Sequence, residues 1–292
     1  MQKINNMKLN RMLVFIMTII FILLITLLFS PSLSTTLLGQ YRFDLPTNIP
    51  NEDHKYQLIW EDEFDGDNLD SNSWNIIQRN NVTWGRYMSP HKKLYNISKG
   101  RIRLYTMRNT FNKKDTAQIL TAGISTKHKR TFKYGKVEVR ARIKGVQGSW
   151  PAIWTMPDND RFADMNSEQR AEIDIMEYLN KNNYAYQTVH SHYIDIQKKE
   201  KIPQVKAKIK KNKYNTFAVE ILPSKLIFSV NGNPTFVYEK QEPTPIGQYP
   251  FGIEQYLLID MQFGGTWVKS IRPQKLPCYM DVEWVKIYKL IK

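Results

Sequence analysis

The chain has 292 residues, with 42 lysines and arginines against 27 aspartates and glutamates, so its formal net charge is +15. A single cysteine, Cys278, excludes an intramolecular disulfide and therefore a disulfide-stapled scaffold. The basic balance suits an anionic partner, but no nucleic-acid recognition motif accompanies it, so nucleic acid is not the partner we expect.

The first predicted element is an uncharged apolar run over residues 12–29, which follows Lys3, Lys8 and Arg11. It is long enough to span a bilayer and slightly longer than a usual signal-peptide core. We therefore expect residues 1–29 to be a signal peptide or an uncleaved membrane anchor. In both cases the basic flank stays in the cytoplasm, and the rest is exported, as a membrane-anchored, secreted or periplasmic domain.

Residues 30–55 contain three prolines among Asn, Ser and Thr, a composition that predicts a linker. The remaining residues, 56–292, are numerous enough for one large core. Within them Val137, Val139, Ala141 and Ile143 alternate with charged residues, which predicts a half-buried strand.

Further strand signals follow towards the C-terminus. Residues 226–230 and 235–238 flank Asn231-Gly232-Asn233-Pro234, which predicts a hairpin. Residues 217–222, 257–263 and 282–288 continue the series, and only residues 164–169 suggest a short helix. The pattern predicts an all-β domain, a sandwich of two antiparallel sheets.

The segment Glu172-Ile173-Asp174-Ile175-Met176-Glu177 threads three carboxylates through apolar residues. In a strand, alternation places Glu172 and Asp174 on one face. A bulge at Ile175-Met176 would return Glu177 to that face. The result is a row of three acids on one side of a strand, suited to acid–base and nucleophilic chemistry.

Two other interpretations of the same segment remain: a solvated strand edge, or a helix whose apolar stripe is Ile173, Met176 and Leu179. Neighbouring motifs weigh against both, because Trp150–Trp154 lies just upstream and two histidines lie downstream. His190 and His192 alternate along a strand-like run, so we expect both to point the same way, with His190 near Glu177. A zinc site is disfavoured, since no third ligand stands at metal-like spacing.

Residues 198–213 hold eight lysines and one glutamate. This run is either a solvated loop or a basic rim that attracts an anionic glycan, sulfated or sialylated, through long-range electrostatics.

Six motifs in order carry a resemblance to a known family. They are Trp60–Gly66 (W-x-D-E-F-x-G), Ser125–Lys127 followed by Tyr134–Arg140, Trp150–Trp154 (W-P-A-x-W), Glu172–Glu177 (E-x-D-x-x-E), Phe263–Trp267 and Met280–Tyr288. Together they resemble glycoside hydrolase family 16, retaining endo-β-glycanases on a β-jelly-roll sandwich with a concave substrate cleft. The likeness extends from about Trp60 to Tyr288.

The resemblance implies that Glu172 is the nucleophile and Glu177 the general acid/base. Asp174 lies between them, and its charge would help to keep Glu177 protonated. The reaction implied needs no cofactor, although a structural calcium ion near Glu63, Gly100 and Asp281 on the convex side is also implied. We expect a monomer acting on a polysaccharide or glycan.

The resemblance also implies a cleft lined by aromatic and polar side chains. The substrate-binding residues that we expect are Trp84, Arg86, Trp150, Trp154, His190, His192, Gln262 and Trp267. The resemblance makes at least one of Trp150 and Trp154 a sugar platform, and the alternative is that both are core. Trp267 follows two glycines that let the backbone come close to a sugar.

The bulged acid motif is shared by β-1,3-glucanases, agarases, carrageenases and endo-β-galactosidases, so it does not identify the substrate. Many β-1,3-glucanases carry an N-x-E-x-Q-x-Y-T segment where this chain has Trp84–Pro90. The W-x-x-x-M-S form here is more similar to members that cut β-1,4-galactosyl bonds in mucin- or keratan-type glycans. We therefore expect an endo-β-1,4-galactosidase, with a β-1,3-glucanase or a catalytically idle glycan-binding module as alternatives.

Overall fold

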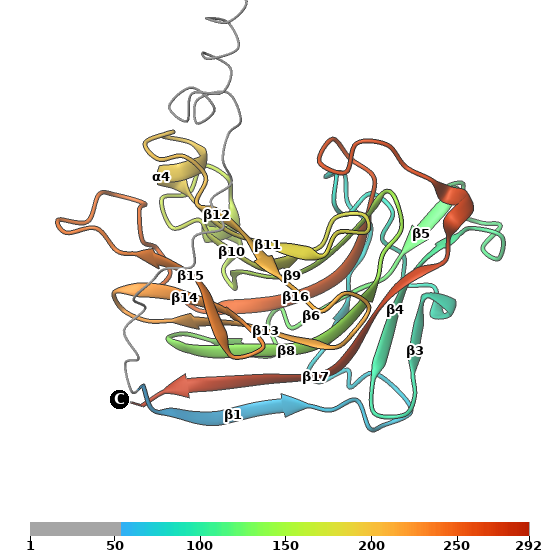
Figure 1. The fold of residues 1–292 in the computed structure, drawn as a ribbon, viewed down its shortest axis with the longest axis horizontal. Helices are drawn as coiled ribbons and strands as arrows, with labels where there is room; N and C mark the ends of the chain where they lie inside the picture. Colours follow the sequence, from blue (N-terminus) through green and yellow to red (C-terminus); the bar gives the residue numbers. More distant parts are fainter. Residues whose placement is uncertain (1–53, 292) are drawn as a thin grey trace, which may run out of the picture. The chain divides into compact units, whose positions relative to one another are not determined.

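A computed structural model describes residues 54–291. Within them the strands form two antiparallel sheets that lie as layers, one above the other (Figure 1). The nine-stranded sheet has the order β15-β14-β13-β8-β17-β4-β3, with β1 paired to β17 and β5 to β4. Its strands are β1 (Tyr56–Asp62), β3 (Tyr95–Ile97), β4 (Ile102–Arg108), β5 (Ile119–Thr121), β8 (Gly135–Lys144), β13 (Asn215–Ile221), β14 (Lys225–Val230), β15 (Asn233–Glu239) and β17 (Cys278–Leu290).

The eight-stranded sheet has the order β12-β11-β10-β9-β16-β6-β2, with β7 paired to β16. Its strands are β2 (Asn75–Ile76), β6 (Gly123–Ser125), β7 (Thr131–Phe132), β9 (Ser149–Pro157), β10 (Ala171–Glu177), β11 (Tyr184–Ser191), β12 (Gln204–Lys208) and β16 (Gln255–Phe263). The helical turns are short: η1 (Lys92–Leu94), α3 (Asp160–Ala163), α4 (His192–Asp195) and η2 (Pro273–Lys275). The expected all-β, jelly-roll type of sandwich is confirmed.

The core lies between the two sheets and follows from the alternation of the strands. In β8 the side chains of Val137, Val139 and Ala141 are buried, while the charged residues between them face outward. They share one apolar cluster with Ile173 and Ile175 of β10 in the other sheet. Burial of apolar area contributes about 25 cal/mol per Å², so these inward faces supply most of the stabilisation.

The predicted hairpin is confirmed as β14 and β15. Asn231 and Gly232 at its turn have φ angles of 54° and 77°. Positive φ at two consecutive turn residues matches the twist of a two-stranded ribbon and explains why Asn-Gly is found there. The expected helix over residues 164–169 is wrong: the helical turn α3 ends at Ala163, and Arg170 closes a turn onto Ser167.

No helix in the part of the chain that the structure describes is long and apolar enough to cross a membrane. The apolar run over residues 12–29 and nearly all of the expected linker lie outside the described residues. Both remain predictions.

Candidate active site

Strand β10 carries the three acids, and its pairing shows a bulge. Asp174 pairs with Thr188 of β11, whereas Glu177 pairs with Tyr186, so β10 uses one residue more than β11 over this stretch. The pairing with β9 is shifted at the same place. The extra residue returns Glu177 to the face of Asp174, and the bulge predicted at Ile175-Met176 is confirmed.

The bulge also separates polar from apolar side chains. Ile173, Ile175 and Met176 are fully buried in the core between the sheets. Asp174 and Glu177 are only 5% and 6% exposed, on the opposite face, and Glu172 is partly exposed. A helix and a solvated strand edge are therefore both wrong interpretations, because the acids are enclosed on a strand.

The pKa of Glu177 is raised more than that of Glu172. Burial, and next the charge of Asp174, raise the pKa of Glu177 well above its ordinary value. Two donors hold the carboxyl: Trp150 Nε1 donates to Oε1 at 2.8 Å, and Thr188 Oγ1 lies 3.4 Å from Oε2. A carboxyl kept protonated at neutral pH and fixed in orientation is suited to act as a general acid.

Glu172 has a different environment. Burial and then Asp174 raise its pKa, but positive charges on His190 and Arg170 oppose the rise. Arg170 donates from Nη2 to Oε2 of Glu172 at 2.8 Å. The neighbouring guanidinium favours the ionised carboxylate, so of the two glutamates Glu172 loses its proton first.

His190 joins the acids to a residue outside the motif. Its Nδ1 lies 2.9 Å from Asp195 in α4, and its Nε2 lies 3.4 Å from Asp174. Burial alone would lower the pKa of His190, but these two carboxylates raise it well above its ordinary value. A carboxylate facing each ring nitrogen favours the imidazolium form, which can donate from both nitrogens.

Arg170 completes this network, since its Nε donates to Asp195 at 3.2 Å while Nη2 holds Glu172. Ligand atoms of Glu172, Asp174 and His190 all lie within 4.8 Å of one another, a spacing that a metal ion could also use. Each of the three side chains already makes an ion pair, Glu172 with Arg170, and Asp174 and His190 with each other. The ionic network accounts for this cluster without a metal.

The two tryptophans of β9 lie differently. Trp150 is partly exposed and bonds to Glu177. Trp154 is buried and donates from Nε1 to Asp260 Oδ2 at 2.8 Å. Trp84 packs edge-on against Trp154, with ring centroids 5.1 Å apart. Trp154 thus lies beneath Trp84, and Trp84 presents the more accessible ring.

The side chain of Arg86 lies against Gly264, in the segment that leads to Trp267. A Cβ added to Gly264 would lie 2.5 Å from the Arg86 guanidinium, so the absence of a side chain at Gly264 lets Arg86 rest there. Trp267 is 39% exposed and stacks on Trp150, with centroids 6.2 Å apart and planes 13° apart. Of the expected aromatic residues it offers the most open face.

Gln262 and Asp260 are neighbours on β16, and both are buried. Oε1 of Gln262 and Oδ1 of Asp260 have no hydrogen-bond partner within residues 54–291. Burial raises the pKa of Asp260 to about 7, against the hydrogen bond from Trp154 that lowers it. Gln262 pairs across the sheet with Trp150, which places it next to the residue that orients Glu177.

His192 does not continue the strand of His190, contrary to our expectation. Strand β11 ends at Ser191, and His192 opens the helical turn α4. Its Cβ lies 3.1 Å from where a Cβ on Gly247 would be. Because the strand ends, the two histidines do not share a strand face, and His190 alone contacts the acid row.

At the expected calcium position the carboxylates already have basic partners. Arg103 donates to both oxygens of Asp281, at 2.5 and 3.0 Å, and Arg142 adds a bond of 2.6 Å. Glu63 lies 3.8 Å from the ammonium of Lys286, and Gly100 lies at a turn with φ of 61°. The carboxylate that would bind a cation is already surrounded by guanidinium groups, so the side chains present do not fit calcium.

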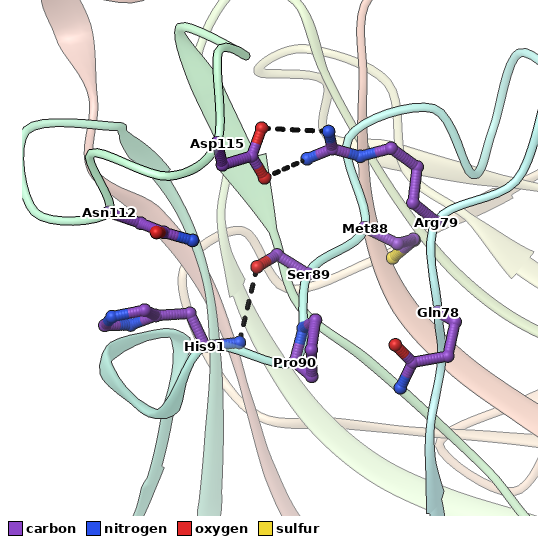
Figure 2. A pocket seen from close by; sticks show the side chains of 8 residues that line it. All are labelled: Gln78, Arg79, Met88, Ser89, Pro90, His91, Asn112 and Asp115. Carbon is purple, nitrogen blue, oxygen red and sulfur yellow. Dashed lines mark hydrogen bonds and ion pairs between the residues drawn. The ribbon is translucent and has the colours of Figure 1, made fainter.

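A cavity of about 380 Å³ is lined by Gln78, Arg79, Met88, Ser89, Pro90, His91, Asn112 and Asp115 (Figure 2). Figure 2 shows the two bonds that join Arg79 to Asp115, of 2.9 and 2.6 Å. Met88 lines this cavity and also packs with Trp154. No residue of the acid row lines it, so it is not the reaction centre.

Several site residues were not predicted from the sequence. Arg170 and Asp195 lie outside the family motifs. They come together because the chain turns from β11 into α4, which brings Asp195 to Arg170. Tyr184 and Tyr186 stand at alternate positions before Thr188, so extending the strand by its period of two would have placed them on the same face. Tyr186 also contacts Trp267 edge-on at 5.4 Å.

The comparisons with known proteins agree with this geometry. A family model described as "Glycosyl hydrolases family 16" matches residues 91–286. A keratan-sulfate endo-1,4-beta-galactosidase of Sphingobacterium multivorum is 31% identical over 236 residues, which is 80% of this chain and 56% of that protein. A beta-glucanase of Rhodothermus marinus is 23% identical over 248 residues, covering 81% of this chain and 86% of the relative.

Among solved structures, one comes from work on endo-acting O-glycanases that members of the human gut microbiota express to initiate mucin breakdown. It is 27% identical, has a TM-score of 0.69, and covers 80% of this chain and 100% of its own. The chain spans little more than half of the keratan-sulfate relative, so that protein's whole activity does not transfer with the match.

Proposed function

This chain belongs to glycosyl hydrolases family 16, and on that premise we propose that it is a retaining endo-β-1,4-galactosidase acting on glycans of mucin and keratan type. The observation that carries the proposal is the difference between the two glutamates on one face of β10. The pKa of Glu177 is raised well above its ordinary value, and His190 opposes the rise at both glutamates, whereas Arg170 opposes it at Glu172. One acid and one carboxylate on a common face form the pair that glycoside hydrolysis uses, and retention is the outcome that the family resemblance implies.

In the first step Glu172 attacks the anomeric carbon, and Glu177 gives its proton to the oxygen of the departing sugar. This forms a glycosyl–Glu172 ester and breaks the glycosidic bond. In the second step Glu177, now ionised, takes a proton from water, whose oxygen attacks the same carbon and releases Glu172. Asp174 lies between them on the same strand face, where His190 holds it at 3.4 Å.

Two similarities support galactose-containing chains. The 31% identical relative is named for keratan sulfate, and the 27% identical structure comes from work on mucin breakdown. In this chain the segment Trp84–Pro90, whose Trp84 packs on Trp154, stands where many β-1,3-glucanases carry a different segment. A buried partner for the axial 4-hydroxyl of galactose would be left unpaired by glucose, at a cost of about 1–3 kcal/mol.

A β-1,3-glucanase is the second candidate, because the beta-glucanase relative covers as much of this chain. A glycan-binding module without turnover is the third, and the complete acid row weighs against it. We also propose that the domain works outside the cytoplasm, held by residues 12–29 or released after cleavage near Ser32–Ser34. Sequencing the N-terminus of the mature protein distinguishes these two, and a whole chain found in the cytoplasm contradicts both.

The test of the activity is product analysis on laminarin, agarose, keratan sulfate and mucin glycans side by side, with Glu172→Gln as the control. We expect short oligosaccharides from keratan sulfate or mucin glycans and none above the control from laminarin. Fast cleavage of laminarin alone would make the chain a glucanase. Release of nothing from any polymer would favour the binding module.

A further inference from the structure

A row of side chains leads from the general acid to the edge of the eight-stranded sheet. Strands β10, β11 and β12 lie side by side (Figure 1), and in their register Glu177 pairs with Tyr186, which pairs with Lys206. Adjacent strands are about 4.8 Å apart, so Lys206 stands roughly 10 Å from Glu177. This is close enough to meet a substituent on one of the first sugars beyond the cleaved bond.

Aromatic rings fill the same row. The ammonium of Lys206 lies 5.0 Å from the ring centre of Tyr184 and 5.7 Å from that of Tyr186. Tyr186 contacts Trp267, and Trp267 stacks on Trp150, whose indole holds Glu177. A continuous strip therefore joins the acid that protonates the leaving group to Lys206, with ring faces and edges of the kind on which sugars pack.

The ring contacts hold the lysine in place. Lys206 is half-buried, whereas Lys201, Lys208 and Lys210 of the same basic run are exposed. A long ammonium side chain normally loses rotamer freedom when it binds an anion, and a position fixed over two rings reduces that cost. Lys206 is thus the member of residues 198–213 that is best prepared to bind.

A cation at this position also favours an acidic substrate. Glu172 and Asp174 lie on the floor of the site, and like charges repel an approaching sulfate or carboxylate. A lysine next to the leaving-group side compensates this repulsion locally, and it adds a charge-assisted hydrogen bond.

We propose that Lys206, presented over Tyr184 and Tyr186, forms a subsite for an anionic substituent of the glycan on the leaving-group side of Glu177. The ligand class is a sulfate ester or a sugar carboxylate on a chain otherwise held by the aromatic strip. This inference rests on the proposed glycan hydrolysis but not on the identity of the cleaved sugar.

The test compares kcat/KM on matched pairs of substrates for the full chain. One pair is keratan sulfate and its chemically desulfated form, another is sialylated poly-lactosamine before and after sialidase, and a third is sulfated and plain laminarin. The variants are Lys206→Gln, Lys206→Arg and, as a control that loses the same charge within the basic run but off β12, Lys201→Gln.

For Lys206→Gln we expect the preference for the charged over the uncharged partner to fall about 10-fold, the change in rate that a charge-assisted hydrogen bond of ~1.4 kcal/mol provides. Lys206→Arg should keep most of that preference, and Lys201→Gln should leave it as in the parent. The pair that responds, sulfated or sialylated, identifies the anion. An equal loss from both members of every pair, or an equal effect of Lys201→Gln, would overturn the proposal.

The design separates this inference from the proposed substrate. If only laminarin is cleaved, the galactosidase proposal fails while the sulfated and plain laminarin pair still tests Lys206. If nothing is cleaved, equilibrium binding of the same pairs to the parent and to Lys206→Gln measures the same preference. An unchanged binding preference then contradicts the subsite.

Discussion

The indole Nε1 of Trp150 donates a hydrogen bond of 2.8 Å to Oε1 of Glu177. Trp150 reaches this position because β9 and β10 are neighbours and the bulge turns Glu177 to the outer face of the sheet. Thr188 Oγ1 donates a longer bond of 3.4 Å to the other oxygen, Oε2. The shorter bond from Trp150 thus fixes the orientation of the carboxyl that delivers the proton.

Replacing this donor should change the basic side of the pH profile. The Trp150 bond lowers the pKa of Glu177 against the rise caused by burial. In Trp150→Phe the ring remains and the donor is lost, so the pKa rises further and activity persists to higher pH. The measurement is kcat/KM against pH, where the basic limb should move upward while kcat falls. A basic limb that does not move contradicts this role.

The acidic side of the profile depends on Arg170. Its guanidinium lies 2.8 Å from Glu172, and its charge opposes the rise in the pKa of that carboxyl. Arg170→Gln should therefore raise the pKa of Glu172, and because the nucleophile must be ionised, the acidic limb moves to higher pH. Arg170→Lys keeps the charge and should move the limb less. Equal shifts in both variants would point to a packing role instead.

Asp260 gives a prediction for stability. Burial raises its pKa to about 7 from an ordinary 3.8. As pH rises above 3.8 the unfolded chain loses this proton while the folded chain keeps it, so the folded state is progressively destabilised until about pH 7. At roughly 1.4 kcal/mol per pKa unit, the loss is at most about 4 kcal/mol.

Asp260→Asn removes this ionisation and leaves a carbonyl to accept from Trp154. Its free energy of unfolding, measured by urea denaturation, should exceed that of the parent more at pH 8 than at pH 4. A difference that is the same at both pH values would show that folding does not raise the pKa of Asp260.

The nucleophile itself gives the largest expected effect. Glu172→Gln should lower kcat by ~10³-fold or more, because a neutral amide cannot form the ester intermediate. The fold should persist, since Glu172 is partly exposed and lies outside the core. Circular dichroism and thermal unfolding provide the control for folding, and near-normal turnover would remove Glu172 from the mechanism.

The sequence predicted those features that depend on local periodicity. Alternation in β8, the Asn231-Gly232 turn and the bulge in β10 each follow from residues close together in the chain, and all are confirmed. The family membership was also predictable, because ordered motifs with fixed spacing are specific even where identity is low.

What the sequence did not reveal depends on where strands end and which faces meet. His192 has the spacing of a strand residue, but β11 stops one residue earlier and the chain turns into α4. That turn brings Asp195 to His190 and Arg170, a contact between segments with no shared periodicity. The arginines around Asp281 belong to β4 and β8, so only the sheet order brings them together.

The stereochemistry of the first product tests the central claim most directly, that Glu172 and Glu177 act as nucleophile and acid on one face of β10. Proton NMR of a fresh reaction, read before mutarotation, shows which anomer is released first. The β-anomer is expected, since two displacements at the same carbon retain configuration. Release of the α-anomer first would require direct attack by water and would contradict the covalent role of Glu172.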